Sequence, residues 1–500
     1  MTHGANGKRP NILLVVSDQE RQRDWLPATV ELPWRERLLA EGMELTNYWT
    51  HSSPCSPSRA TMMTGQYVTQ HQVAENVIFP WQPELDPATP TIGGALRGAG
   101  YRSSYIGKWH LSRSARPDME AYGYGDWDGN DHHFMGLAGT GVHFDPVIAN
   151  NAAHWLRRNA DAPDPWFLTV ALVNPHDVMW YPIDQPEYQR AHPRTMEFIR
   201  QFLDGDWGGG QAIPPYERPY DEVFSELPGN FDDDLYTKPD TQRQWRHDQQ
   251  HSLYGRIDPA DKGAWLRQLD YYAQLHRLAD ESLGKVLGAL EESGGWDDTI
   301  VVFTSDHGDM CGGHGLRSKG PFVYDEIMRV PCYVKAPGTT RPGTVSDSLA
   351  SHVDLASTIC ALAGVPAPDS FRGVDLTPVF RDPRASVRDY VLFAHEATHT
   401  RRIQRTRYAV RGMFDGRFKY ARYFGVGGGL PADLGEKPEP STMLYGPDAD
   451  FDDNDHELYD LQEDPGELVN LAMDRARRVE LRERFGKLCA VEGEEFAPLD

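Results

Sequence analysis

The sequence predicts an α/β fold built on a large, mostly parallel central sheet, followed by a smaller C-terminal α+β domain with an antiparallel sheet. Residues 11–16, 166–173 and 299–304 are largely apolar runs, which is typical of strands buried on both faces of a parallel sheet. Helical patterns separate them, most plainly the amphipathic repeat over residues 264–293. Together these two observations predict the central sheet.

The antiparallel sheet is predicted by a change of pattern after a Pro-rich connection near residue 385. Three short strand patterns follow at 390–395, 408–413 and 418–424, the last two separated by an Asp-Gly turn. We therefore expect a larger domain over residues 1–385 and a smaller one over 386–500. Within the first, residues 185–263 show little periodicity, and we expect an irregular insertion that forms a pocket wall.

Composition limits the partners of the chain. Its 500 residues carry a formal net charge of −24, so no basic face is available for a nucleic acid. No apolar run is long enough to span a membrane, and the first ten residues lack the centre of a signal peptide. The five cysteines are widely spaced, which favours reduced thiols and a cytoplasmic location. A homo-oligomer is left open.

The segment 54–65 is the most informative stretch of the chain. Ser56 has the character of a helix N-cap, Pro57 of a first helical residue and Gly65 of a left-handed stop. Cys55 would then lie at the positive end of a short helix, with Arg59 one turn further in. This arrangement predicts an anion site beside a nucleophile.

Three interpretations of Cys55 compete. A buried structural cysteine is the ordinary one, and a tyrosine-phosphatase loop would need five residues between Cys and Arg, whereas Cys55 and Arg59 are separated by three. The pattern Cys-x-Pro-Ser-Arg followed by Thr-Gly resembles the signature of the type I sulfatases. In that family the cysteine is oxidised by a formylglycine-generating enzyme, and the hydrated aldehyde is the nucleophile. Its second hydroxyl then allows sulfate to be expelled.

Coordinating side chains follow two of the apolar runs. Asp18 and Gln19 come after the first, and Asp306 and His307 after the third. Carboxyl ends of parallel strands meet at one edge of a sheet, where ligands bind. Oxygen donors suit Ca²⁺ or Mg²⁺, while the imidazole leans toward Mn²⁺. The resemblance implies one divalent cation, with Ca²⁺ the first expectation, held by these four residues and by oxidised Cys55.

The remaining site residues are expected from the resemblance. Lys108 and His110 lie in a second sulfatase-like signature, Gly-Lys-Trp-His, and would share one face if the preceding strand continued through them. Lys108 would hold the diol with Arg59, and His110 is positioned as a base. His176 follows the middle apolar run and would contact the leaving-group oxygen.

Three more residues complete the expected site. Lys319 resembles the sulfate-binding lysine of the family, and His314 a companion in substrate binding. Asn76 resembles a substrate-contacting amide, with an Asn that stabilises its own loop as an equal alternative.

The resemblance covers nearly the whole chain and implies an alkaline-phosphatase-like sandwich. It implies hydrolysis of a sulfate monoester. Gln19 and His307 are more similar to the choline-sulfatase and phosphonate-monoester-hydrolase branch, so a phosphonate monoester or phosphodiester hydrolase is the alternative. A non-enzymatic alternative is an inactive relative that binds anions, with Cys55 unmodified.

Overall fold

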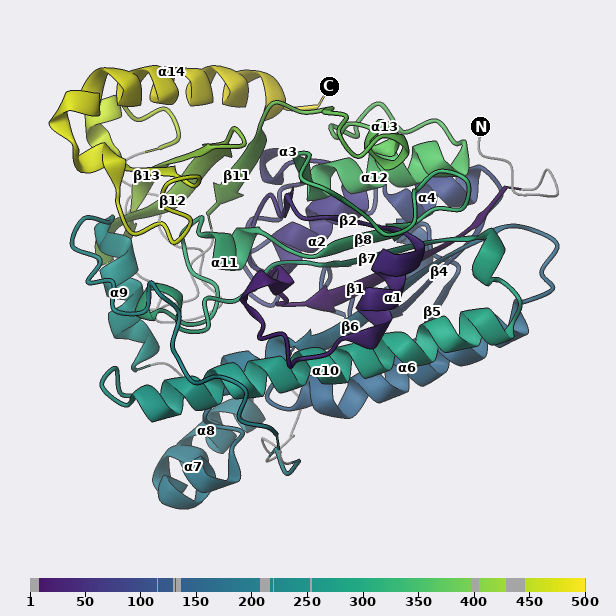
Figure 1. Cartoon of the computed structure of the whole chain (residues 1–500), viewed down its shortest axis with the longest axis horizontal. Helices are drawn as coiled ribbons and strands as arrows, with labels where there is room; N and C mark the ends of the chain where they lie inside the picture. The colour runs from purple at the N-terminus through teal and green to yellow at the C-terminus, as the bar shows by residue number, and fades with distance from the viewer. Residues whose placement is uncertain are drawn as a thin grey trace.

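The computed structural model describes residues 9–114, 116–128, 131, 136–206, 216–218, 220–251, 254–396, 404–428 and 446–499. Within these residues it contains an eight-stranded sheet, a four-stranded sheet and a two-stranded pair (Figure 1). The predicted combination of a mostly parallel sheet and a smaller antiparallel one is confirmed.

The larger sheet runs in the order β5-β4-β6-β1-β7-β8-β2-β9. All its neighbours pair in parallel except β8, which runs antiparallel to β7 and to β2. Its strands are β1 (Asn11–Asp18), β2 (Met43–Leu45), β4 (Arg102–Gly107), β5 (Asp126–Asp128), β6 (Trp166–Pro175), β7 (Thr299–Ser305), β8 (Cys332–Lys335) and β9 (Thr344–Ser346), while β3 (Tyr48–Trp49) pairs with β10 (Ala350–Ser351).

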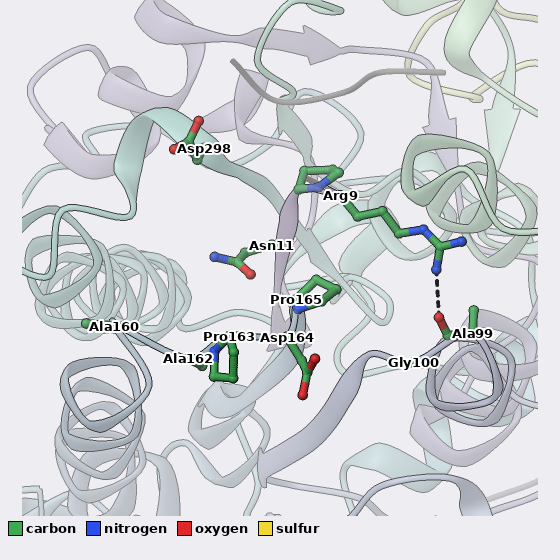
Figure 2. Close-up of a pocket in the computed structure, with 11 residues that line it drawn as sticks. Arg9, Asn11, Ala99, Gly100, Ala160, Ala162, Pro163, Asp164, Pro165 and Asp298 are labelled. Atoms are coloured by element: carbon green, nitrogen blue, oxygen red, sulfur yellow. Dashed lines mark hydrogen bonds between the residues drawn. The ribbon is translucent and has the colours of Figure 1, made fainter. Parts of the chain in front are cut away.

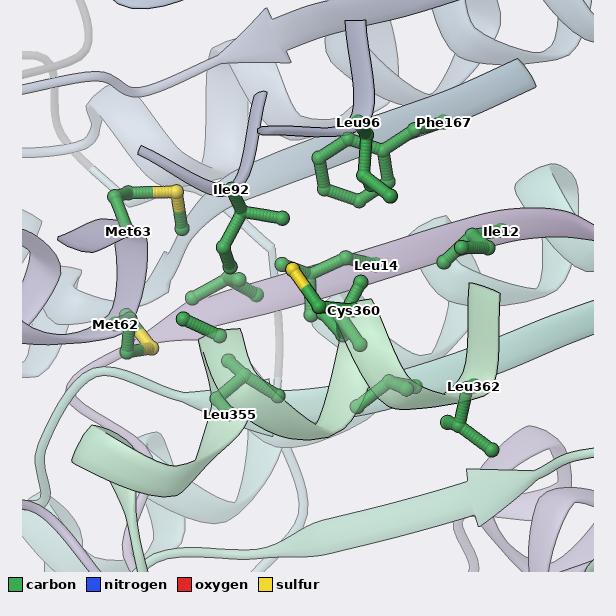
Figure 3. Packing of buried hydrophobic residues seen from close by; sticks show 14 of the residues in the cluster. Ile12, Leu14, Met62, Met63, Ile92, Leu96, Phe167, Leu355, Cys360 and Leu362 are labelled. Atoms are coloured by element: carbon green, nitrogen blue, oxygen red, sulfur yellow. The ribbon is translucent and has the colours of Figure 1, made fainter. Parts of the chain in front are cut away.

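Helices cover both faces of this sheet (Figure 1). In β1, Leu13 and Val15 pack with α6 (Thr140–Arg158) and α10 (Lys262–Glu292). Ile12 and Leu14, which point to the other face, pack with α2 (Cys55–Thr64), α4 (Ile92–Gly98) and α12 (His352–Ala363), as Figure 3 shows. The period of two along the strand thus divides the core into two layers.

The other helices of the described residues lie around this sandwich. They are α1 (Pro33–Glu41), α3 (Val68–His71), α7 (Pro186–Ala191), α8 (Pro193–Asp206), α9 (Asp240–Gln249), α11 (Asp325–Met328), α13 (Thr377–Arg381) and α14 (Arg478–Glu495).

The C-terminal sheet is antiparallel, in the order β11 (Val391–His395), β12 (Gln404–Phe414), β13 (Phe418–Gly428) and β14 (Asp455–Asp460). Leu392 and Leu458 face α14, which lies across the sheet in Figure 1. Phe393 and Tyr423 belong to another core cluster and pack there with Trp49 of β3. The strand patterns of the sequence predict β11 to β13 but not the strand at residues 455–460.

Two expectations from the sequence were wrong in part. The weak periodicity of residues 121–144 predicts a long loop, but they contain β5 and the first turn of α6. The insertion 185–263 was expected to be irregular apart from a short helix over residues 194–203, which corresponds to α8, but it also contains α7 and α9. Polar residues and Pro146 inside α6 weaken the apolar repeat by which a helix is recognised.

A cavity of about 360 Å³ lies at the amino ends of β1, β6 and β7 (Figure 2). Asn11, Pro165 and Asp298 line it, and the Arg9 guanidinium donates a hydrogen bond to the Ala99 carbonyl at 2.6 Å. The strand-end residues singled out in the sequence lie at the opposite, carboxyl ends. In the part of the chain that the structure describes, no helix has the length and apolar character needed to cross a membrane.

Candidate active site

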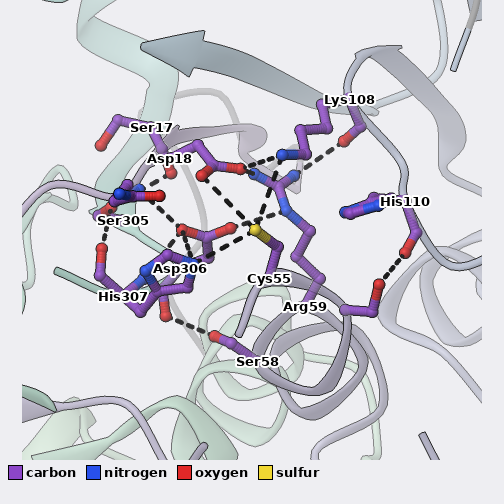
Figure 4. Close-up of polar contacts among 12 residues, drawn as sticks. Ser17, Asp18, Cys55, Ser58, Arg59, Lys108, His110, Ser305, Asp306 and His307 are labelled. Atoms are coloured by element: carbon purple, nitrogen blue, oxygen red, sulfur yellow. Dashed lines mark hydrogen bonds and ion pairs between the residues drawn. The ribbon is translucent and has the colours of Figure 1, made fainter. Parts of the chain in front are cut away.

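The carboxyl ends of four neighbouring strands bring the predicted residues together. Asp18 ends β1, Lys108 follows β4, His176 follows β6 and Asp306 follows β7. Because β4, β6, β1 and β7 are adjacent in the sheet, these four residues lie at one edge of it. Figure 4 shows Asp18, Lys108 and Asp306 there.

Helix α2 presents Cys55 to this edge. The helix ends at Gly65 with φ 61°, as predicted, but it begins at Cys55 with Pro54 as N-cap, so the assignment of Ser56 as N-cap was wrong. The Ser56 hydroxyl instead donates to the His110 carbonyl at 2.6 Å. This contact uses the side chain that would otherwise cap the helix.

Polar groups surround the Cys55 sulfur, which is 1% exposed. Its Sγ lies 3.1 Å from Lys319 Nζ, 3.3 Å from His307 Nε2, 3.7 Å from Asp18 Oδ1 and 3.8 Å from Lys108 Nζ. Burial alone would raise the pKa of Cys55, but the positive charges of Lys108, Lys319 and His307 outweigh it and lower that pKa well below its ordinary value. The position therefore stabilises a negative charge at residue 55.

Arg59 joins the two strand-end aspartates. Its Nε donates to Asp306 and its Nη2 to Asp18, both at 2.9 Å, while Nη1 donates to the Lys108 carbonyl at 2.8 Å. Lys108 Nζ also lies 2.6 Å from Asp18. We expected Arg59 to reach back to residue 55. Its guanidinium instead bridges the carboxylates of Asp18 and Asp306.

The two carboxyl groups differ in their pKa values. Burial would raise the pKa of Asp18 and so would Cys55, but Lys108, His176 and Arg59 lower it below its ordinary range. Burial, with Asp18 as a negative neighbour, raises the pKa of Asp306 to about 6. A further cation near both groups would favour their ionised forms.

The side chains of Asp18, Cys55, Asp306 and His307 form a cluster that could hold a metal ion. Each is buried, and one ligand atom from each lies within 4.8 Å of the others. Two carboxylate oxygens and an imidazole fit a divalent cation, and an oxidised residue 55 would add a further oxygen.

Gln19, the other predicted ligand, makes different contacts through its side chain. Its Nε2 donates to Asp309 and its Oε1 accepts from Lys319, both at 2.5 Å. Its backbone N–H donates to Asp306 Oδ1 at 3.0 Å. The amide carbonyl thus lies beside the lysine that contacts residue 55.

His110 is held by a carboxylate that the sequence did not predict. The strand β4 ends at Gly107, and His110 has φ 58°, so the condition for a shared strand face with Lys108 is not met. Asp131 accepts from the backbone N–H groups of Trp109 and His110, at 3.0 and 2.8 Å. Burial, with the positive charge of Lys108, lowers the pKa of His110 although Cys55 and Asp131 oppose this, and the lowered pKa favours the neutral imidazole that a base requires.

His176 occupies the same edge. Its ring packs against Gly136, where an added Cβ would lie 2.4 Å from Cε1. Burial and the charge of Lys319 are the leading causes that lower the pKa of His176 to about 3, and Asp18 opposes them. Cys55, like Asp18, acts to raise that pKa, so His176 faces the same centre.

Two predicted substrate contacts are directed elsewhere. The Asn76 carbonyl oxygen accepts from the Ser56 backbone N–H at 3.1 Å, which supports the alternative of a structural Asn. His314 Nδ1 lies 2.8 Å from Asp233 Oδ2, and its ring stacks on Tyr324 at 3.9 Å between centroids. None of the described contacts of His314 is to the residues around Cys55.

Backbone strain gathers in these strand-end loops. Gln19, His110, Cys311, His314 and Ser318 are non-glycine residues with positive φ. Each costs free energy that neighbouring contacts must offset, and such residues are frequent at functional sites. The loop 309–320, which carries Lys319, contains three of the five.

Sequence reasoning missed Asp309, Asp131 and Gly136. Asp309 ends the Ser-Asp-His-Gly-Asp motif and could have been singled out there. Asp131 and Gly136 carry no local signal, because their partners are 21 residues and 40 residues away along the chain.

Comparisons of the sequence with known proteins identify sulfatases as its relatives. The sulfatase family profile matches residues 10–365, and that of the N-sulphoglucosamine sulphohydrolase C-terminal family matches residues 312–446. The chain is 28% identical over 416 residues to the uncharacterized sulfatase YidJ of Escherichia coli, covering 75% of this chain and 72% of that protein. It is 25% identical over 427 residues to an N-acetylglucosamine-6-O-sulfatase of Bacteroides thetaiotaomicron, covering 77% and 73%.

Solved structures agree on the fold. A putative sulfatase from Bacteroides thetaiotaomicron has a TM-score of 0.71 at 22% identity, covering 98% of this chain and 93% of that one. The phosphonate monoester hydrolase of Agrobacterium radiobacter has a TM-score of 0.70 at 21% identity, covering 97% and 96%. These likenesses confirm the alkaline-phosphatase-like architecture, and because the family profile spans most of the chain, the protein belongs to the sulfatase family.

Proposed function

We propose that this sulfatase hydrolyses a sulfate monoester to an alcohol and inorganic sulfate, with residue 55 as the nucleophile. The observation that carries the proposal is the placement of Cys55 among Lys108, Lys319, His307 and the Asp18 carboxylate. A sulfate ester is an anion that resists attack, so its oxygens must be neutralised while a nucleophile is presented. In a chain of net charge −24, this local concentration of positive charge is a specific feature.

The proposal includes two groups that the chain must acquire. Cys55 would be oxidised to formylglycine by a formylglycine-generating enzyme, and its hydrate would supply the attacking hydroxyl. Asp18, Asp306 and His307 would hold one divalent cation, with Gln19 a further candidate ligand and Ca²⁺ the first choice over Mn²⁺ and Mg²⁺. A cation there supplies Lewis acidity, which lowers the pKa of a coordinated hydroxyl.

The protein's own side chains would perform the remaining steps. Lys319 and Lys108 would neutralise the sulfuryl oxygens and the negative charge at residue 55. His110, neutral because of burial, would accept a proton from the nucleophile, and His176 would face the departing alcohol. Arg59 would hold Asp18 and Asp306 in position through its two ion pairs.

A phosphonate monoester or phosphodiester hydrolase is the second candidate. Gln19 and His307 favour it, and the chain is 25% identical over 429 residues to the multifunctional alkaline phosphatase superfamily protein PehA of Trinickia caryophylli. Sulfate and phosphonate monoesters both present a singly charged group, so the same cationic side chains could accept either.

Rates on matched esters separate the two candidates. The protein, coexpressed with a formylglycine-generating enzyme, is assayed with an aryl sulfate, an aryl phosphonate monoester and N-acetylglucosamine 6-sulfate. We expect the highest kcat/KM on a sulfate. A hundredfold preference for the phosphonate would replace the sulfatase assignment, and the variant Cys55→Ala controls for contaminating hydrolases.

Mass spectrometry of the peptide that contains Cys55 addresses the non-enzymatic alternative. Material from the native host should carry the aldehyde at residue 55. An unmodified cysteine there, together with no bound metal, would identify an inactive relative that binds anions.

A further inference from the structure

We propose that Asp309 is a positioning residue that acts through Gln19 to hold Lys319 against residue 55. The proposal rests on the proposed function in that it assigns Lys319 to the binding of sulfuryl oxygens. The three side chains form one hydrogen-bonded row: Asp309 Oδ2 accepts from Gln19 Nε2, and Gln19 Oε1 accepts from Lys319 Nζ. Lys319 Nζ then lies 3.1 Å from Cys55 Sγ.

The row is buried, so its polar groups depend on one another. Gln19 is 0% exposed, and Asp309 and Lys319 are each 1% exposed. The backbone of Gln19 is fixed on both sides, because its N–H donates to Asp306 and its carbonyl accepts from the Tyr272 hydroxyl at 2.5 Å. With the backbone held in this way, the remaining question is whether the oxygen or the nitrogen of the Gln19 amide faces Lys319.

The negative charge of Asp309 and the positive charge of Lys319 determine the orientation of the amide. With the amide nitrogen toward Asp309 and the oxygen toward Lys319, both contacts are attractive. The reversed amide would point its oxygen at a carboxylate and its N–H groups at an ammonium, with both contacts repulsive. The carboxylate of Asp309 therefore directs the carbonyl of Gln19 to the lysine.

Asp309 also fixes the loop that carries Lys319. Its Oδ1 accepts from the backbone N–H groups of Cys311 and Ser318, at 2.7 and 3.2 Å. Both of these residues have positive φ, so the carboxylate stabilises two strained positions at the ends of one loop. One oxygen of Asp309 holds the loop and the other orients Gln19.

This geometry also explains why residue 19 is an amide. A carboxylate at position 19 would lie against the Asp309 carboxylate in a buried site, where like charges cannot both ionise without cost. This chain has an amide at position 19 and an acid at position 309. An acid at position 19 with an amide at position 309 would be equally compatible. The protein should therefore tolerate both substitutions made together, an acid at position 19 and an amide at position 309, but neither substitution alone.

The exchange predicts the outcome of each variant. In Asp309→Asn the loop N–H groups require the oxygen of the new amide, so its NH₂ faces Gln19 and reverses the Gln19 amide against Lys319. In Gln19→Glu two carboxylates meet. In the double variant Gln19→Glu/Asp309→Asn, the amide introduced at position 309 donates to one oxygen of the carboxylate introduced at position 19. The other oxygen of that carboxylate accepts from Lys319.

Binding of inorganic sulfate, measured by calorimetry, tests the proposal without a known substrate. Each single variant should bind sulfate about tenfold more weakly or worse, as expected for buried polar groups left unpaired. The double variant should return to within about threefold of the unsubstituted protein. Asp184→Asn is the matched control, since Asp184 is equally buried but bonds to Tyr271 and Gln185, and it should leave sulfate affinity unchanged.

Crystal structures of the same variants give a second measurement that needs no sulfate affinity. Lys319 Nζ should move away from residue 55 in each single variant and return in the double. The proposal is overturned if the losses of the single variants simply multiply in the double, or if Lys319 stays in place in Asp309→Asn. Sulfate binding that follows this pattern in a protein that hydrolyses no sulfate ester would reject the proposed function alone.

Discussion

Replacing Arg59 by methionine tests the idea that a buried guanidinium holds the two strand-end aspartates together. Arg59 donates to Asp18 and to Asp306 at 2.9 Å each, and both carboxylates are 0% exposed. Asp18 would keep the cation of Lys108 at 2.6 Å, whereas Asp306 would keep two backbone N–H donors, those of Gln19 and His307, and the His307 imidazole, whose Nε2 lies 3.6 Å from Oδ1. The uncompensated charge of Asp306 therefore dominates the cost.

Removing one partner from a buried ion pair costs about 3–5 kcal/mol. We expect a loss of that size in the free energy of unfolding of Arg59→Met, measured by urea titration in the presence of a chelator. Saturating Ca²⁺ should reduce the loss to less than half, because a cation between the carboxylates replaces the missing charge. Arg59→Lys should be intermediate, since it keeps the charge but loses the fork.

The control is Arg190→Met, which breaks an exposed ion pair to Glu187 and should change the free energy of unfolding by about 0.5 kcal/mol or less. A free energy for Arg59→Met within about 1 kcal/mol of the unsubstituted protein in chelator would refute the reasoning. A loss that Ca²⁺ leaves unchanged would refute the link between Arg59 and the metal ligands.

Three further predictions concern the nucleophile, the metal and the pH dependence. Cys55→Ser should lower kcat about 10³-fold or more in steady-state assays, because a serine lacks the second hydroxyl, and turnover near that of the oxidised protein would contradict this. Chelation should abolish hydrolysis and one of Ca²⁺, Mg²⁺ or Mn²⁺ should restore it, whereas full activity after dialysis against chelator would remove the metal from the mechanism. Burial lowers the pKa values of His51 and His71 to about 3, against about 6.5 in the unfolded chain, so the unfolded state binds more protons as the pH falls below 6.5. The free energy of unfolding should then fall by about 2 kcal/mol per histidine at pH 5, and His71→Gln should make that fall shallower; an equally steep fall would exclude His71.

The strand ends could be predicted from the sequence because each is a local pattern. An apolar run followed by Asp18 or Asp306 predicts both the strand and the carboxylate at its end, and the sheet topology then brings the two aspartates together. The helix stop at Gly65 was equally local, since φ 61° there suits glycine.

Contacts between distant segments could not be predicted in this way. Gln19 and Asp309 are 290 positions apart, and nothing near Gln19 reveals that its amide faces an acid and a lysine. Ser56 has the residue type of an N-cap, but the carbonyl of His110, 54 positions away, takes its hydroxyl. Local propensity gives way where tertiary contacts offer a better partner.

The burial of helix α2 sets an order of events for the making of the proposed nucleophile. All ten of its residues are buried, and Cys55 is 1% exposed beneath the strand-end loops. An enzyme that oxidises Cys55 must reach its side chain, and the folded protein buries that side chain. In the proposed function, oxidation of Cys55 would therefore precede the completion of folding, and a chain that folds first would keep its thiol.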